Sequence, residues 1–108
     1  MRRIPKKLRE EMNSDPFYHK CVCAGDNFGC AGKIEFHHVF LWAGRQINEK
    51  WNILPVCEFH HRGLGFDKEY FEWIAVNRAT NEELVKYPRI NWAQIRSYLN
   101  SQYGNYAN

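Results

Sequence analysis

Four cysteines and five histidines carry most of the reactive chemistry of this 108-residue chain, and all nine lie between His19 and His61. The start of the chain lacks the apolar stretch of an export signal, which predicts a cytoplasmic protein without a disulfide framework. In a small chain in a reducing compartment, thiols and imidazoles clustered in this way indicate metal binding.

Spacing divides the candidate ligands of a first metal into two pairs. Cys57 and His60 are three residues apart, where a turn entering a short helix can aim both side chains at one ion. Cys30 lies in a preceding loop together with Cys21 and Cys23. Four such ligands make a closed tetrahedral zinc site, which is structural. We prefer Cys21 as the fourth ligand, with Cys23 the alternative, because the longer loop to Cys30 closes with less strain. Buried free thiols are the competing interpretation.

A second set of polar residues remains beside this predicted zinc site: His37, His38, Asn52 and His61. A lone histidine is usually structural. A His-His pair next to a zinc site, with a third histidine directly following a zinc ligand, is a better candidate for a reactive centre.

The elements that must position these residues are short strands and helices, which predicts an α+β fold. Strand-forming residues occupy 34–39 and 53–56, a wide loop of residues 40–51 joins them, and a helical stretch after Cys57 ends at Gly63 or Gly65. Adjacent residues on a strand face opposite ways, so His37 and His38 can serve one site only if the strand bends or ends there. Pro55 suggests an edge strand.

Helices flank this core on both sides. We expect an N-terminal helix over about residues 5–12 and C-terminal helices capped by Asp67, Thr80 and Asn91, with an uncharged, frayed tail beyond Tyr103. Trp92, Ile95, Leu99 and Tyr103 form one apolar stripe. The chain is expected to form a single domain over residues 1–108, with a core at about 21–66 and a helical extension at about 67–103.

Three segments together resemble the signature of the HNH endonuclease family. They are Ile34-Glu35-Phe36-His37-His38-Val39, Trp51-Asn52-Ile53-Leu54-Pro55-Val56-Cys57 and Cys57-Glu58-Phe59-His60-His61. The segment from Ala43 to Trp51 is also similar to a subgroup common in phage and prophage genomes. The resemblance covers about residues 21–62 and implies a ββα-metal (treble-clef-like) core with a structural zinc.

The resemblance also implies a role for each matching residue. His38 matches the general base, and His37 and His61 match ligands of a catalytic divalent ion. Asn52 matches the residue that tethers the loop of the base. His60 departs from the family pattern, which often has cysteine there, but imidazole is an acceptable zinc ligand.

The implied reaction is hydrolysis of a DNA phosphodiester, with double-stranded DNA the expected partner. A divalent ion offsets the phosphate charge and stabilises the leaving oxygen, and a neutral imidazole can take the proton of the attacking water. The ion could be Mg²⁺, Mn²⁺, Zn²⁺ or Ni²⁺, of which imidazole ligands suit Mg²⁺ least. Arg45 and Arg62 are candidate phosphate contacts, with solvated surface arginines the alternative.

Composition is compatible with this prediction and decides little by itself. The net charge of +3 permits a nucleic-acid partner, and no apolar run exceeds the five residues from Val39 to Ala43, so no membrane span is expected. A zinc-stabilised nucleic-acid-binding module without catalysis is the main alternative. A zinc-scaffolded protein-interaction module is another.

Overall fold

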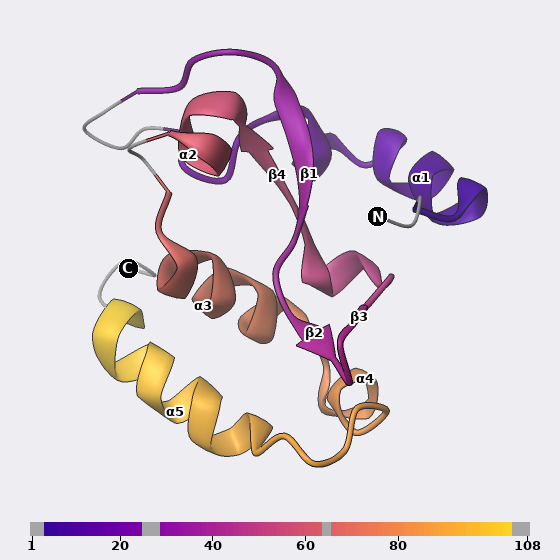
Figure 1. The fold of residues 1–108 in the computed structure, drawn as a ribbon, viewed down its shortest axis with the longest axis vertical. Coiled ribbons are helices and arrows are strands. Elements are labelled where there is room, and N and C mark those ends of the chain that lie inside the picture. The colour runs from indigo at the N-terminus through magenta and orange to yellow at the C-terminus, as the bar shows by residue number, and fades with distance from the viewer. Residues whose placement is uncertain (1–3, 25–28, 64–65, 105–108) are drawn as a thin grey trace.

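The strands and helices expected from the sequence form in a computed structural model, which describes residues 4–24, 29–63 and 66–104. Within those ranges the fold is a mixed α+β arrangement of two antiparallel two-stranded sheets and five α-helices (Figure 1). The elements in chain order are α1 (Lys6–Asn13), the 3₁₀ turn η1 (Pro16–His19), β1 (Ile34–His38), β2 (Leu41–Trp42), β3 (Arg45–Gln46), η2 (Lys50–Asn52), β4 (Ile53–Cys57), α2 (Glu58–Arg62), α3 (Lys68–Arg78), α4 (Asn81–Leu84) and α5 (Trp92–Tyr103).

The central ladder pairs β1 with β4, from Ile34 opposite Cys57 to His38 opposite Ile53. One more backbone bond, from Val39 N to the Asn52 carbonyl at 2.9 Å, continues the ladder past the end of β1. The strand keeps its regular pairing up to His38, where it ends, and alternating side chains leave its two faces. Glu35 and His37 share one face, and Phe36 and His38 share the other.

Pro55 lies at the edge of this sheet, because β4 has β1 as its one strand partner among the described residues. The strand is nevertheless buried along its whole length. The Pro55 carbonyl accepts a hydrogen bond from Val22 N at 2.9 Å, so the segment after η1 covers the edge. Proline fits here because it has no N–H that would need a partner on that edge.

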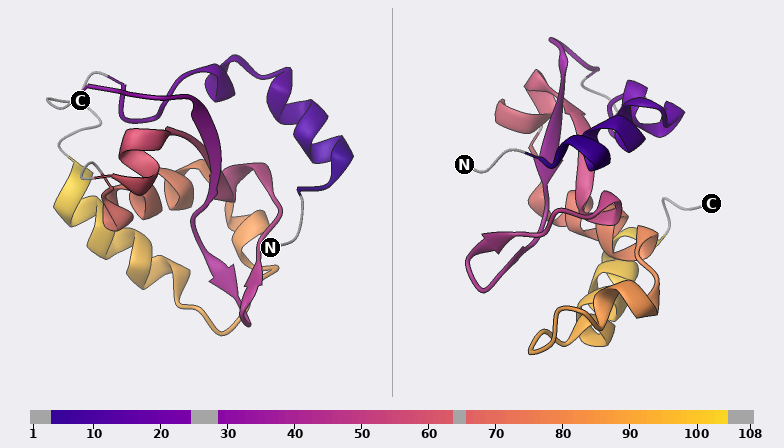
Figure 2. Two further views of the ribbon diagram at one scale, coloured as in Figure 1. Left: turned by 45° about the horizontal axis from the view of Figure 1, so that its top comes forward. Right: turned by 90° about the vertical axis from the view of Figure 1, so that its right-hand side faces the viewer.

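A small hairpin replaces part of the wide loop predicted over residues 40–51. Strands β2 and β3 pair in register Leu41–Gln46 and Trp42–Arg45. Ala43 and Gly44 connect them with φ angles of 52° and 76°, which are the left-handed values of a two-residue hairpin turn. The hairpin projects from the body of the molecule (Figure 2). Sequence reasoning missed it because each strand has only two residues.

The helix caps form as predicted. Asp67 and Asn91 accept hydrogen bonds from Tyr70 N and Gln94 N, and Thr80 makes a reciprocal capping box with Glu83. Helix α2 ends at Arg62 with Gly63 as its cap, whereas Gly65 lies outside the described residues. The tail predicted to fray falls outside the description beyond Gly104.

Three apolar clusters hold these elements together. The largest contains Trp51, Val76 and Leu99, and the predicted stripe on α5 faces it. Helices α3 and α5 pack side by side there (Figures 1 and 2). A second cluster joins Leu54 and Phe71 to the cysteines, and a third packs Met12 of α1 beneath β4. Among the described helices, none is long and apolar enough to cross a bilayer.

Candidate metal centres and functional site

The fold brings four of the predicted ligands to one point: Cys21, Cys30, Cys57 and His60. Their ligand atoms all lie within 4.8 Å of one another. Cys21 follows η1, Cys30 lies in the loop before β1, Cys57 ends β4 and His60 lies in α2. Two loops far apart from the β4–α2 junction in the chain thus supply one candidate ligand each, and that junction supplies the other two.

The spacing of these atoms fits one four-coordinate ion. His60 Nδ1 lies 3.8 Å from the Sγ atoms of Cys21 and Cys30 and 3.1 Å from that of Cys57. Ordinary zinc–sulfur and zinc–nitrogen bond lengths in a tetrahedron place such atoms about 3.6 Å apart. The cluster could therefore hold a metal ion such as zinc.

Two thiols of the cluster, those of Cys57 and Cys30, have pKa values shifted in opposite directions. Burial opposes ionisation of Cys57, but hydrogen bonds from the backbone of His60 and Ala31 and from neighbouring side chains lower its pKa to about 6. Desolvation, followed by the neighbouring sulfurs of Cys21 and Cys57, raises the pKa of Cys30 to about 12. Without an ion the cluster therefore favours a thiolate at Cys57 and opposes one at Cys30. A divalent cation removes that opposition.

Backbone bonds fix the loop that carries Cys30 against the start of α2. Glu58 N and Phe59 N donate to the carbonyls of Lys33 and Ala31, both at 3.1 Å. Gly32 lies between those carbonyls with a φ of +83°, and a Cβ there would lie 2.8 Å from Glu58 Cβ. Only glycine fits this crossing without displacing the chain.

Cys23 is buried but lies outside the four-ligand cluster. Its backbone N–H donates to Cys21 Sγ at 3.4 Å. The structure thus places Cys21, the preferred candidate, in the cluster and the alternative Cys23 outside it.

His37 and His61 form a second group, on the face of β1 that α2 covers. Their ring centroids are 4.9 Å apart, and the rings of Phe66 and Phe71 lie 5.8 and 5.5 Å from His37. Burial, followed by the proximity of His61 and His38, lowers the pKa of His37 to about 4. His37 is therefore neutral at pH 7, the form that can bind a metal.

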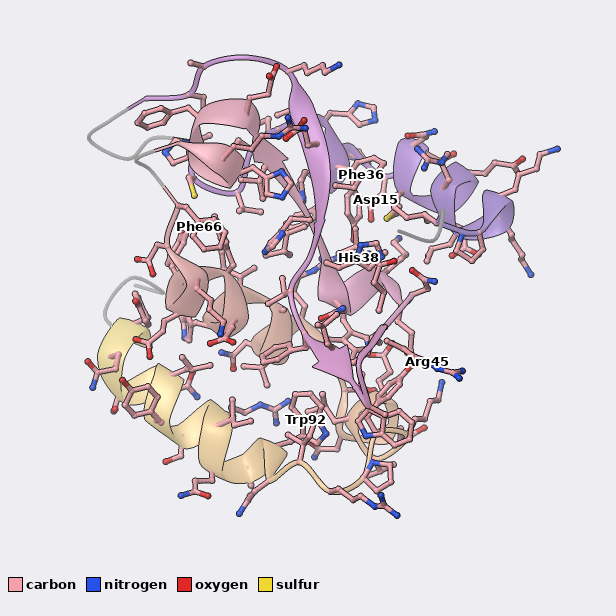
Figure 3. The ribbon with its side chains drawn as sticks, in the orientation of Figure 1. Asp15, Phe36, His38, Arg45, Phe66 and Trp92 are labelled. Carbon is pink, nitrogen blue, oxygen red and sulfur yellow. The ribbon has the colours of Figure 1, made fainter. Side chains whose placement is uncertain are left out.

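His38 leaves the opposite face and contacts a different part of the chain. Its Nε2 lies 2.8 Å from Asn48 Oδ1, in the segment between the β2–β3 hairpin and η2. Figure 3 shows His38 at the end of β1, beside the chain that leads to the hairpin. An amide oxygen can only accept, so Nε2 carries the hydrogen and Nδ1 of neutral His38 is left with a lone pair.

Asn52 holds that segment in place. Its Oδ1 accepts from Phe40 N at 2.7 Å, and its Nδ2 donates to the carbonyls of Phe40 and Ile47, both at 3.0 Å. The side chain is completely buried. One asparagine therefore closes the loop between the strands at both ends and fixes Asn48 next to His38.

The two candidate arginines differ in their surroundings. Arg45 is exposed on β3 and points away from the body of the molecule (Figure 3). Arg62 donates from Nε to Glu35 Oε1 at 2.9 Å and from Nη2 to Glu35 Oε2. Glu35 also bonds His61 Nδ1 at 2.8 Å. The bond from His61 and those from Arg62 hold the pKa of Glu35 below its ordinary value.

Sequence reasoning missed two residues at this site, Glu35 and Asn48. Glu35 could have been found, because it precedes His37 by two residues and must share its face of the strand. Asn48 could not, since its approach to His38 depends on the hairpin and on the loop that Asn52 closes.

Comparison of the chain with known protein families, with curated proteins and with solved structures found no match.

Proposed function

We propose that this protein is a metal-dependent endonuclease of the HNH type, which hydrolyses DNA phosphodiester bonds on a ββα-metal core. The observation that carries this proposal is the arrangement of three histidines at the end of β1. His37 and His61 face each other across a 4.9 Å ring separation, and His38, the next residue of the chain, leaves the other face of β1 at its end with Nε2 held by Asn48. Two ligands could hold an ion that stabilises the leaving oxygen, and a neutral histidine could take the proton of the attacking water.

The donor set of the first two histidines fits a divalent ion. Neutral imidazoles leave the ion its full positive charge, and burial keeps His37 neutral well below pH 7. When bound, the ion supplies charge neutralisation of the phosphate and of the departing oxygen. Imidazole ligands favour Mn²⁺, Ni²⁺ or Zn²⁺ over Mg²⁺.

His38 accepts the proton of the attacking water at Nδ1. Its Nε2–H stays on Asn48 Oδ1 throughout, so the ring does not need to rotate when it becomes positively charged. Asn52 contributes indirectly, because its three hydrogen bonds fix the loop that presents Asn48.

The arginines are proposed to meet the DNA backbone. Arg45 extends from the projecting hairpin, and Arg62 follows His61 with 68% of its side chain exposed. A guanidinium can hold a phosphate with two parallel hydrogen bonds. A two-stranded hairpin such as β2–β3 also has the dimensions to enter a groove of double-stranded DNA.

The Cys21, Cys30, Cys57 and His60 cluster is proposed to hold a structural zinc. All four positions of a tetrahedral ion would be occupied by protein, which leaves none for water or substrate. Its role is to fix α2, and with it His61, against β1.

The test is nicking of supercoiled plasmid by zinc-loaded protein in metal-free buffer, with Mn²⁺, Ni²⁺, Zn²⁺ or Mg²⁺ then added. His38→Ala should keep its zinc and its DNA affinity but lose about 10²–10⁴-fold in rate, the usual contribution of a general base. His19→Ala is the matched control, since His19 bonds Asn13 in the N-terminal region and lies outside the site.

Two results would overturn the proposal in different ways. A wild-type protein that binds DNA but nicks it with none of the four ions would favour the non-catalytic zinc-stabilised module. If wild type nicks the plasmid and His38→Ala nicks it equally fast, the protein is a nuclease but His38 is not its base.

A further inference from the structure

Glu35 is the carboxylate at the candidate site that the proposed mechanism leaves unused. It lies on β1 opposite Val56, and its side chain is 12% exposed. Being two residues before His37, it leaves the strand on the same face. Both of its oxygens are engaged by residues of α2, Oε1 by His61 and Arg62 and Oε2 by Arg62.

The bond to His61 determines which ring nitrogen is free. An ionised carboxylate can only accept hydrogen bonds, so His61 Nδ1 must carry the hydrogen. In the neutral ring the lone pair is then at Nε2, the nitrogen away from Glu35. A histidine ligand whose other nitrogen donates to a carboxylate is held in one tautomer and one orientation, and becomes a stronger base toward the metal.

We infer that Glu35 is a positioning residue, which fixes His61 with Nε2 available to the divalent ion and at the same time orients Arg62. This inference rests on the proposed function and adds to it a residue outside the three histidines. Glu35 acts through His61 and Arg62 and touches neither the ion nor the phosphate.

A purely structural role would not need both partners. Arg62 alone makes two hydrogen bonds to Glu35 and neutralises its charge. The additional 2.8 Å bond from His61 supplies what the ion pair lacks, because it decides the tautomer of the histidine. The same carboxylate also holds the arginine, which donates to it from Nε and Nη2.

The experiment measures Ni²⁺ binding to zinc-loaded protein by calorimetry, together with plasmid nicking across a Ni²⁺ titration. Glu35→Ala should weaken Ni²⁺ binding about 10- to 100-fold, the usual effect of removing such a partner. The Ni²⁺ concentration for half-maximal nicking should rise in parallel, and excess Ni²⁺ should restore most of the rate. Glu35→Gln should recover most of the affinity, because its amide oxygen can still accept from Nδ1–H.

Two further variants separate the contributions. Arg62→Gln removes the ion pair but leaves the Glu35–His61 bond. Its Ni²⁺ affinity should therefore stay within about twofold of wild type, which is less than the roughly tenfold loss expected when the partner of a histidine ligand is removed. Glu72→Ala removes a partly buried carboxylate on α3 and matches the charge change of Glu35→Ala. It should bind Ni²⁺ as wild type does.

A direct readout is the tautomer of His61, taken from two-bond ¹H–¹⁵N correlation spectra of the zinc-loaded protein before Ni²⁺ is added. The wild type should show the Nδ1–H form, and Glu35→Ala should lose this preference. An Nε2–H form in the wild type would overturn the inference even if every Glu35 variant failed to fold.

Failure of this inference differs from failure of the proposed function. If wild-type protein binds no Ni²⁺ beyond its zinc and does not nick DNA, the proposed function fails and the role of Glu35 fails with it. If wild type binds and cuts while folded Glu35→Ala binds Ni²⁺ equally well, the inference alone is wrong.

Discussion

Asn48 and His37 show how neighbours decide what a histidine can do. Asn48 fixes the proton of His38 on Nε2 through a 2.8 Å bond. His37 is instead buried against Phe66, Phe71 and His61, which shield it from water and make its charged form unfavourable. Two adjacent histidines on one strand thus have different chemistry, because they leave opposite faces.

Removing the amide of Asn48 should therefore slow the proposed cleavage without affecting the binding of the proposed metals. Asn48→Ala leaves His38 free to rotate and to adopt either tautomer, and we expect a loss of about 10- to 100-fold, a part of what a general base contributes. Asn48→Asp retains an acceptor for Nε2–H and should recover most of the rate. Nicking at saturating metal measures both. Equal rates for Asn48→Ala and wild type would show that the bond does not orient the base.

The pKa of His37 predicts a dependence of stability on pH. The folded protein keeps His37 neutral down to about pH 4, whereas the unfolded chain binds a proton below the ordinary value of about 6.5. Above that value neither state binds the proton. Between the two values the unfolded state binds more protons, so the free energy of unfolding falls as the pH falls.

Urea unfolding of zinc-loaded wild type and His37→Gln at pH 7.5 and pH 5.5 tests this. The variant cannot gain the proton and should lose less stability between the two pH values. Zinc binding weakens in both proteins alike, so the difference between them isolates His37. Equal losses would contradict the buried, neutral state of this side chain.

Two glycines in left-handed conformations show what individual loops require. Gly44 turns the β2–β3 hairpin at a φ of +76°, and a Cβ at this position would have no neighbour within 4 Å among the described residues. Gly32 crosses the start of α2 in close contact with Glu58. The first needs only backbone freedom. The second needs backbone freedom and also the absence of a side chain.

These two positions should respond differently to the same substitution. Gly44→Ala should cost about 1–2 kcal/mol, the strain of a left-handed residue with a Cβ. Gly32→Ala should add to that strain about 1–3 kcal/mol for overpacking against Glu58. It should also weaken zinc retention, because the displaced loop carries Cys30. Chemical unfolding and a zinc-release assay measure both effects, and equal costs at the two sites would rule out the contact with Glu58.

Within the described residues, the cluster that contains the cysteines and the cluster that contains the tryptophans share helix α3, so they are expected to depend on each other. Trp42, Trp51, Trp73 and Trp92 belong to or pack on the cluster between α3 and α5. Phe71 of the same helix α3 packs on the cysteines. Because helix α3 contributes residues to both clusters, disruption of one cluster is expected to destabilise the other.

Removal of the proposed zinc should consequently unfold the chain and shift its tryptophan fluorescence to longer wavelength. Zinc binding in small metal domains contributes on the order of 10 kcal/mol to folding, which is more than a chain of this size can spare. Cys57→Ser should be unfolded in the same way. Cys23→Ala, at a buried cysteine outside the cluster, should keep its zinc and its fold. Unchanged fluorescence in metal-free protein would show that the helical half is independent.

The local elements and the chemistry-bearing residues could be predicted from the sequence. Strand propensity and spacing located β1 and β4, the polar residues Asp67, Thr80 and Asn91 located the caps of three helices, and the cysteine and histidine spacing selected the ligand candidates. Each of these signals depends on neighbours within a few positions of the chain, so no tertiary information was needed.

The tertiary structure alone decided which candidates meet and how they are oriented. Cys21 rather than Cys23 reaches the cluster because the segment after η1 bonds to β4 through Val22, which no local pattern specifies. Asn48 and Glu35 acquire their partners across 10 and 26 residues of chain. Such contacts follow from strand register and from loop closure by Asn52. Both are set by the packing of the whole domain and not by the residues next to them.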